Sequence, residues 1–201
     1  MLIGPRYKKA KYLGVPVFSK TQTQKYALRS QAQAKTKGRR GNKSEYGLQL
    51  LEKQKARYSY GVSGTQFTKY VKAALQASGD NAKNLLNILE GRLDNVVLRA
   101  GFTTSRSAAR QMVAHGHILV NGKKVTIPSY QVSVGDVMSI REGSKNKALF
   151  AKFDETIKAV KFPSWIKVNA EKREITVDGE PTAETSELLF NVRSVLEFYT
   201  R

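Results

Sequence analysis

Two arginines, Arg106 and Arg110, are four residues apart in the sequence. Arg106 directly follows Ser105, a residue type that often caps helices. On a helix this spacing places both guanidinium groups on one face, near an N-terminus whose free N–H groups attract anions. A guanidinium group can hold a phosphate through two parallel hydrogen bonds. The residue types and their spacing therefore predict binding of phosphate groups.

Other residues that could carry chemistry do not form a catalytic or metal site. The stretch 38–44 superficially resembles a P-loop, but its spacing is wrong and no buried strand precedes it. His115 and His117 lack a third ligand and the chain has no cysteine, so their simpler roles are packing, hydrogen bonding or stacking on RNA. No Ser-His-Asp order or nucleophile elbow is present. We predict no enzyme activity, metal, cofactor or small-molecule substrate.

The elements that must position the two arginines lie in residues 92–142. Apolar residues at helical spacing predict a helix over 92–100. A second helix, which carries both arginines and which Thr104 or Ser105 can cap, is expected to run to about residue 115. Residues 118–125 predict a hairpin because an Asn-Gly pair separates two short apolar or basic runs, and a further strand is expected over 137–140. The stretch predicts a compact helix-helix-β unit with one basic edge.

Composition indicates a polyanionic partner. The chain has 201 residues and a formal net charge of +19. Residues 1–60 hold 15 Lys and Arg against 2 acids, and residues 92–142 hold 7 against 3. This balance favours nucleic acid first and an anionic membrane surface second. No apolar run approaches the roughly 20 residues of a membrane span, so we expect no transmembrane segment.

The N-terminal stretch 1–43 shows little sign of regular structure. Its segment 35–43 is basic and glycine-broken, which predicts an extended arm. Aromatic residues interleave with the charges of this region: Tyr7, Tyr12, Phe18 and Tyr26. One interpretation is a disordered solubilising tail. We favour a basic arm that phosphates order, with rings that stack on bases or form a small apolar anchor.

The rest of the chain predicts helices and short strands. Helices are expected over residues 45–58, 65–78, 81–90 and 147–161. Strands are expected over residues 165–168, 174–177 and 195–199. The predicted fold class is α+β: a mostly helical N-terminal domain with a basic extended arm, and a small helix-helix-β RNA-binding domain inserted before a C-terminal helix and short strands. The predicted domains are 1–91, with 143–201 packing back on it, and 92–142.

Several runs carry a resemblance to a known family. RLDNVVLRAGF, SRSAARQMVAHGHILVNGKKV and IPSYQVSVGD, within residues 92–136, resemble the small RNA-binding domain named after the fourth protein of the small ribosomal subunit. That domain also occurs in pseudouridine synthases and tyrosyl-tRNA synthetases. SEYGLQLLEKQKARYSYGVSGTQF at 44–67, NLLNILEGRLDNV at 84–96 and IGPRYKK at 3–9 are similar to the ribosomal family itself. The chain is identified as a member of the family of bacterial-type ribosomal small-subunit protein four.

The resemblance implies a structural protein that binds small-subunit ribosomal RNA directly and early, holds a junction of RNA helices and nucleates assembly of the subunit body. It also implies a place where mRNA enters, beside small-subunit proteins three and five, with an influence on translational accuracy. Some members carry a four-cysteine zinc site in the N-terminal arm, which this chain cannot form. The residues expected to contact RNA are Arg6, Lys8, Lys9, Lys35, Lys37, Arg39, Arg40, Lys43, Lys53, Arg57, Arg92, Arg99, Ser105, Arg106, Arg110, Gln111, His115, His117, Asn121 and Lys123.

Two other functions compete with this interpretation. An RNA-modifying enzyme would need a separate catalytic domain, and residues 143–201 are too short and lack a plausible active site. A protein bound to membrane surfaces is disfavoured because the segment 35–43 has no apolar helical face. The first 14 residues lack the apolar segment of a secretory signal, so a cytoplasmic protein in the ribosome is expected.

Overall fold

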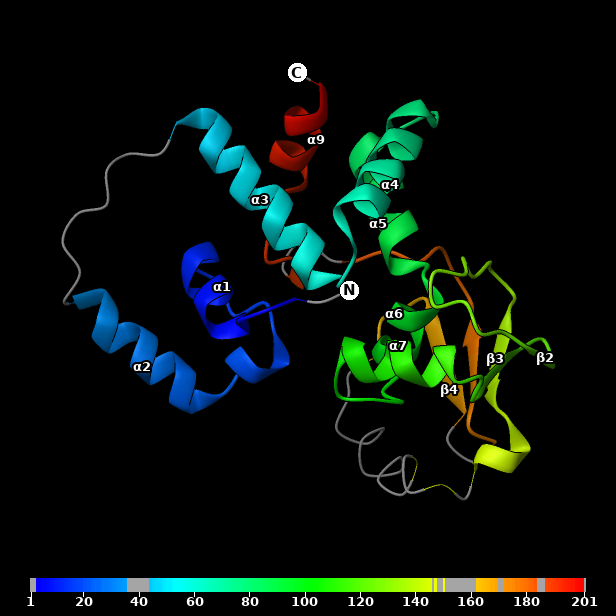
Figure 1. The fold of residues 1–201 in the computed structure, drawn as a ribbon. Helices are drawn as coiled ribbons and strands as arrows, with labels where there is room; N and C mark the ends of the chain where they lie inside the picture. Colours follow the sequence, from blue (N-terminus) through cyan, green and yellow to red (C-terminus); the bar gives the residue numbers. More distant parts are fainter. Residues whose placement is uncertain are drawn as a thin grey trace. The chain divides into compact units, whose positions relative to one another are not determined.

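The computed structural model describes residues 3–35, 44–145, 147, 150, 162–169, 172–183 and 187–200. The chain forms two compact units, shown in Figure 1. The helical unit comprises 1–82 and 185–201, and the sheet unit comprises 83–184. This division differs from the expected one, since residues 143–184 group with the sheet unit and 185–201 group with the N-terminal helices.

The helical unit begins with two helices where we expected little regular structure. They are α1 (Arg6–Leu13) and α2 (Gln24–Lys35), joined through a 3₁₀ turn, η1 (Ser19–Thr21). In this respect the prediction for residues 1–43 was wrong. Leu13 of α1 packs in a small core with Val17 and Leu51, so tertiary burial stabilises a helix whose composition is dominated by cations. The predicted extended arm at 36–43 lies outside the described residues.

Three further helices complete the helical unit: α3 (Glu45–Ser59), α4 (Gly64–Gln76) and α9 (Val192–Thr200). The Ser44 side chain caps α3 by accepting a hydrogen bond from the backbone N–H of Gly47. Figure 1 shows α9 alongside α3. The predicted strand at 195–199 was wrong. A short apolar run fits a strand or a buried helix equally well, and here Val195 is buried on a helix that the Asn191 side chain caps at Ser194.

The sheet unit contains α5 (Asn81–Glu90, which starts at the boundary), α6 (Leu93–Arg99) and α7 (Arg106–Ala114). Its strands are β1 (Ile118–Val120), β2 (Lys123–Lys124), β3 (Val137–Ile140), β4 (Ile166–Asn169) and β5 (Glu174–Val177). They form an antiparallel sheet in the order β2-β1-β3-β5-β4. A short 3₁₀ turn, η2 (Glu142–Ser144), follows β3.

One apolar core joins α6 and α7 to the sheet. Val96 and Val97 from α6, Met112 and Val113 from α7, and Met138 from β3 are all almost fully buried in it. Trp165 also belongs to this core, and its indole N–H donates to the carbonyl of Thr182 at 2.7 Å. The predicted α+β class is confirmed, as are the strands at 166–169 and 174–177. Most of the helix predicted over 147–161 lies outside the described residues.

Candidate nucleic-acid interface

Helix α7 starts at a capped turn that holds its first arginine in place. The Ser105 side chain accepts from the backbone N–H of Ala108, as the sequence predicted, and Thr103 donates to the Ser105 carbonyl at 3.1 Å. Ser105 is therefore half-buried and acts as a cap. One turn further on, Arg110 is exposed, while Arg106 is half-buried. The two arginines lie on the same side of α7, as their spacing requires.

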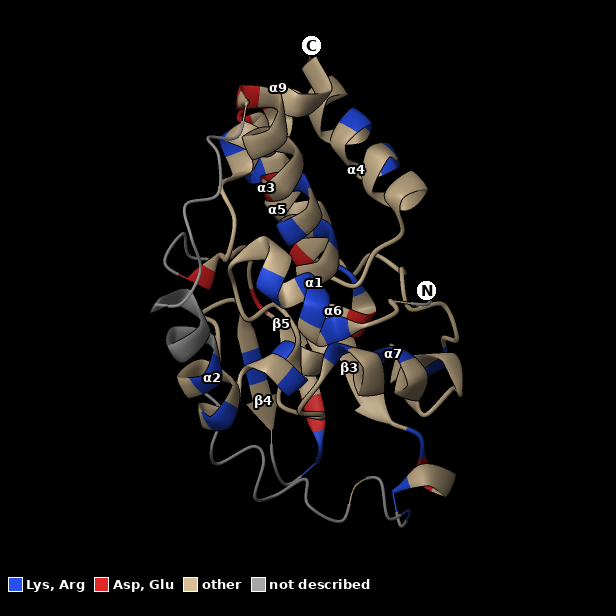
Figure 2. Ribbon diagram, turned by 60° about the vertical axis from the view of Figure 1, so that its left-hand side comes forward, with Lys and Arg blue, Asp and Glu red and all other residues tan. Residues whose placement is uncertain are grey.

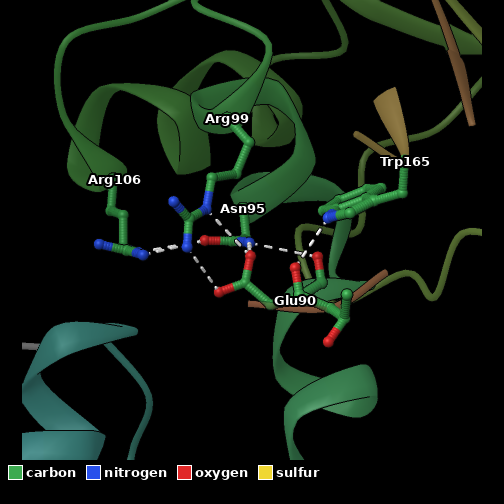
Figure 3. Close-up of polar contacts among 6 residues, drawn as sticks. Glu90, Asn95, Arg99, Arg106 and Trp165 are labelled. Carbon is green, nitrogen blue, oxygen red and sulfur yellow. Dashed lines mark hydrogen bonds and ion pairs between the residues drawn. The ribbon is translucent and has the colours of Figure 1, made fainter. Parts of the chain in front are cut away.

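A network of buried polar groups reaches Arg106 from the end of α5, as Figure 3 shows. Asn95 accepts from Nε and Nη2 of Arg106, at 3.3 and 3.1 Å. The Asn95 amide nitrogen donates to the carboxylate of Glu90 at 2.6 Å and to the Glu90 carbonyl at 3.2 Å. Arg99 donates to both oxygens of that carboxylate, each at 3.0 Å. Glu90 is fully buried and the Arg99 side chain is 21% exposed, so the pair fixes Asn95 and, through it, the Arg106 guanidinium.

The β1–β2 hairpin supplies a second group of cations beside the end of α7. Asn121 and Gly122 have φ of 50° and 75°, the left-handed pair that a tight hairpin requires, as predicted. The Asn121 amide accepts from the N–H of Val137 and donates to Asp136, so this side chain anchors the hairpin to β3. Lys123 and Lys124 are exposed. 

Lys124 also marks how close the hairpin comes to α7. Gly116 follows α7 with a φ of 67°, and a Cβ at that position would overlap the Lys124 side chain. Glycine is favoured there for its backbone conformation, whereas the flexible end of the Lys124 side chain could move aside. Lys124 was missing from the predicted RNA contacts, although it neighbours Lys123 in the same hairpin. We call the set Arg106, Arg110, Gln111, His115, Lys123 and Lys124 the α7 face; all its members except Arg106 are exposed.

Arg92 does not lie on this surface, which corrects the expectation that it extends the basic face. Only 2% of the residue is exposed. Its Nε and Nη2 donate to the two carboxylate oxygens of Asp94, at 2.9 and 2.6 Å. Backbone hydrogen bonds from Leu93 to Tyr130 and from Val132 to Gly91 close a loop over this pair. Arg92 therefore forms a buried ion pair with Asp94, which has a structural role.

His117 is also buried, with only 8% of the residue exposed, so it does not belong to the predicted RNA-binding surface either. Its Nδ1 lies 2.9 Å from the Ser144 hydroxyl, and its ring packs edge-on against Phe150 with centroids 6.4 Å apart. Burial, followed by the charges of Lys147, His115 and Arg141, lowers the pKa of His117 below its ordinary value. The lowered pKa favours the neutral form of His117, which connects η2 to the start of β1, whereas His115, two residues earlier, is exposed.

In the helical unit, three predicted contacts lie on aromatic rings of their own unit. Lys53 lies 4.2 Å from the Phe198 ring centroid, and Arg57 lies 4.6 Å from that of Tyr58. Lys9 lies 4.9 Å from the same Tyr58 ring and donates to the carbonyl of Ile3. Burial alone would raise the pKa of Tyr58, but the hydrogen bond from Lys9 and the charge of Arg57 bring it below its ordinary value. These cation–ring contacts stabilise the fold of the unit, and the three side chains remain partly exposed to solvent.

The remaining predicted contacts of the N-terminal region have mixed positions. Arg6 is half-buried and Lys8 is exposed, both on α1. Lys35 ends α2. Lys37, Arg39, Arg40 and Lys43 lie outside the described residues. Figure 2 shows Lys and Arg residues along α1 and α2.

The described residues offer little support for other kinds of site. Among them, no three His, Asp or Glu side chains are placed to share a metal ion. A hollow of about 460 Å³ lies near η2, but cations such as Lys145 and Lys172 share its lining with Glu142 and Glu174. No helix within the described part of the chain has the length and apolar character to span a bilayer.

Comparisons with known proteins find relatives that cover almost the whole chain. Residues 1–90 match the model described as ribosomal protein S4/S9 N-terminal domain, and residues 91–138 match the S4 domain. Proteins named small ribosomal subunit protein uS4 are similar along almost their full length. The protein of Cutibacterium acnes is 42% identical over 201 residues, 98% of each chain. That of Chromobacterium violaceum is 44% identical over 206 residues, 99% of this chain and 98% of the relative.

Proposed function

Because the chain belongs to the uS4 family of small ribosomal subunit proteins, we propose that it binds small-subunit ribosomal RNA directly, through the α7 face and the N-terminal cations. As a member of this family it is a structural constituent of the small subunit and not an enzyme, which removes the RNA-modifying alternative. The observation that carries the proposal is the α7 face itself. It gathers cations from a capped helix and a tight hairpin, all of them exposed except the half-buried Arg106. Asp136, beside the hairpin, is hydrogen-bonded to Asn121.

The chemistry of this face suits the backbone of folded RNA. Guanidinium groups bind phosphate oxygens bidentately, and lysines add point charges. Gln111 and His115 can exchange hydrogen bonds with 2′-hydroxyl groups, which A-form RNA displays in its shallow groove. Because such contacts read shape and backbone rather than base edges, the face fits a site where several RNA helices meet. The 36–43 arm, with Lys37, Arg39 and Arg40, adds charge to this proposal from outside the described residues.

Family membership supports the wider role. We infer that the protein binds early, nucleates assembly of the subunit body and works in cytoplasmic ribosomes. It would lie where mRNA enters, beside small-subunit proteins five and three, and contribute there to translational accuracy. A strain whose only copy carries a weakened α7 face should accumulate incomplete small subunits, and normal subunit profiles at wild-type protein levels would contradict the assembly role.

A binding experiment with a matched control tests the core of the proposal. The double variant Arg106→Ala, Arg110→Ala should weaken binding to small-subunit ribosomal RNA by roughly tenfold or more, since charge-assisted hydrogen bonds contribute about 1.5–3 kcal/mol each. The control Lys69→Ala, Lys72→Ala removes the same charge from exposed positions of α4. Circular dichroism verifies folding, and chemical footprinting locates the site. Equal losses for both variants, or protection scattered over the RNA without a focus, would refute a site at the α7 face.

A further inference from the structure

Helix α1 has two faces of different character. Ala10 and Leu13 are buried against the rest of the helical unit, and Arg6 and Lys9, on the same side, are half-buried. The opposite side carries Tyr7, Lys8, Lys11 and Tyr12, all exposed; we call this set the α1 face. The two tyrosines are 55% and 56% exposed, among the highest values for large aromatic side chains in the described residues.

The α1 face is held in a fixed position. Gly14, with a φ of 77°, ends the helix, and its N–H donates to the carbonyl of Ala10. The Tyr7 ring also packs against Tyr26 of α2, with centroids 5.7 Å apart. Between the two helices, Thr21 and the backbone of Phe18 exchange two hydrogen bonds. The exposed rings therefore project from a packed scaffold, so a ligand would meet a preformed surface.

Charge selects the kind of ligand. No acidic residue precedes Glu45 in the chain, and α1 contains four cations in eight residues. A lone exposed tyrosine needs no explanation. Here, however, each tyrosine has a lysine one helical turn away, Tyr7 with Lys11 and Tyr12 with Lys8, so each pair offers a ring and a cation side by side.

The pairing distinguishes two forms of RNA. A duplex buries its base faces in the stack and presents phosphates and hydroxyls, which the lysines alone could bind. Unpaired nucleotides expose a base that stacks on an aromatic ring and a phosphate that binds the adjacent cation. Taking the chain as an RNA-binding ribosomal protein, as proposed above, we propose that the α1 face binds unpaired nucleotides, with bases stacked on Tyr7 and Tyr12 and phosphates held by Lys8 and Lys11.

The test uses the full chain and two probes: an unstructured RNA oligonucleotide carrying 2-aminopurine, and an A-form RNA duplex with the same number of phosphates. The variant Tyr7→Ala, Tyr12→Ala removes the stacking of two bases and should weaken binding to the oligonucleotide by about thirtyfold or more, since stacking contributes on the order of 1–3 kcal/mol per base. It should also abolish the quenching of 2-aminopurine, and change duplex binding by less than about twofold. The variant Tyr7→Phe, Tyr12→Phe keeps the rings and should bind both probes like the wild type.

Each other outcome overturns the inference. Equal losses on duplex and oligonucleotide would mean that the variant lowers general affinity, and losses in the Phe variant would assign the role to the hydroxyls. Unchanged affinity for both probes would make the α1 face a surface for another protein. The proposed function fails separately. Suppose that Arg106→Ala, Arg110→Ala binds ribosomal RNA normally while Tyr7→Ala, Tyr12→Ala loses affinity for the oligonucleotide. That result would support RNA binding by the α1 face and refute RNA binding by the α7 face.

Discussion

Replacing Asn95 by alanine should lower both the stability of the sheet unit and its affinity for RNA. Asn95 is 2% exposed and connects a buried carboxylate, Glu90, to the Arg106 guanidinium. The substitution removes a charge-assisted hydrogen bond at 2.6 Å, contributing about 1.5–3 kcal/mol, and weaker bonds to Arg106 and to the Glu90 carbonyl at about 1 kcal/mol each. Water can replace the bond to the half-buried Arg106. We therefore expect the free energy of unfolding to fall by roughly 3 kcal/mol, measurable by urea denaturation.

The effect on RNA binding follows from the loss of orientation. Without Asn95 the Arg106 side chain must be ordered by the RNA itself, at a cost of about 0.5–1.5 kcal/mol for one long side chain. That cost corresponds to binding weakened about twofold to twelvefold, at tenfold per 1.4 kcal/mol. The measurement is a dissociation constant for small-subunit ribosomal RNA at a temperature where the variant remains folded.

A double-mutant cycle separates this orientation from a general loss of structure. In the Arg106→Ala background there is no guanidinium left to orient, so Asn95→Ala should weaken RNA binding no further. The stability loss from the bonds to Glu90 should persist in that background. If Asn95→Ala lowers RNA affinity by the same factor with and without Arg106, the network does not position this arginine and the reasoning fails.

Two further predictions concern buried ionisable residues, Asp94 and His117. Asp94→Ala should cost about 3–5 kcal/mol of stability, because it leaves the Arg92 guanidinium buried without its partner; thermal denaturation measures this, and a loss below about 1 kcal/mol would mean that Arg92 reaches solvent. For His117, whose pKa is lowered in the folded state, the unfolded chain takes up a proton first as pH falls below about 6.5. Stability should therefore decline below that pH by at most about 1.4 kcal/mol per pH unit from this group. His117→Gln should flatten the decline in urea titrations, and an unchanged slope would exclude His117 as its source.

Local signals in the sequence predicted most elements of the sheet unit correctly. The Ser105 cap, the Asn121-Gly122 turn and the glycines at 101, 116 and 135 each satisfy a backbone requirement that can be read from a few neighbouring residues. Elements that depend on distant contacts were predicted less well. Helix α1 needs burial of Leu13 against Leu51, and α9 needs α3, so neither a cation-rich stretch nor a short apolar run revealed its structure.

The same distinction explains which candidate contacts were misplaced. Arg92 looked like a surface cation because helical spacing alone cannot show that a loop closes over it, although Asp94 two residues later offered a hint. The Glu90–Arg99 pair spans nine residues across the break between α5 and α6, where no regular periodicity applies. Counting cations alone also overestimates the charge that the sheet unit offers to RNA, because Arg92 and Arg99 are each paired with a buried acid.

That neutralisation changes what the two units contribute to RNA binding. Residues 1–60 carry net +13, whereas residues 92–142 carry net +4, a sum that already counts Asp94 but not Glu90, the partner of Arg99. The few cations of the α7 face must therefore contribute to RNA binding through their positions rather than through their total charge. Arg106→Ala, Arg110→Ala should reduce the steepness of the salt dependence, since each lost phosphate contact lowers the slope by about 1. Asn95→Ala should weaken binding while leaving that slope nearly unchanged, because it moves a charge without removing one.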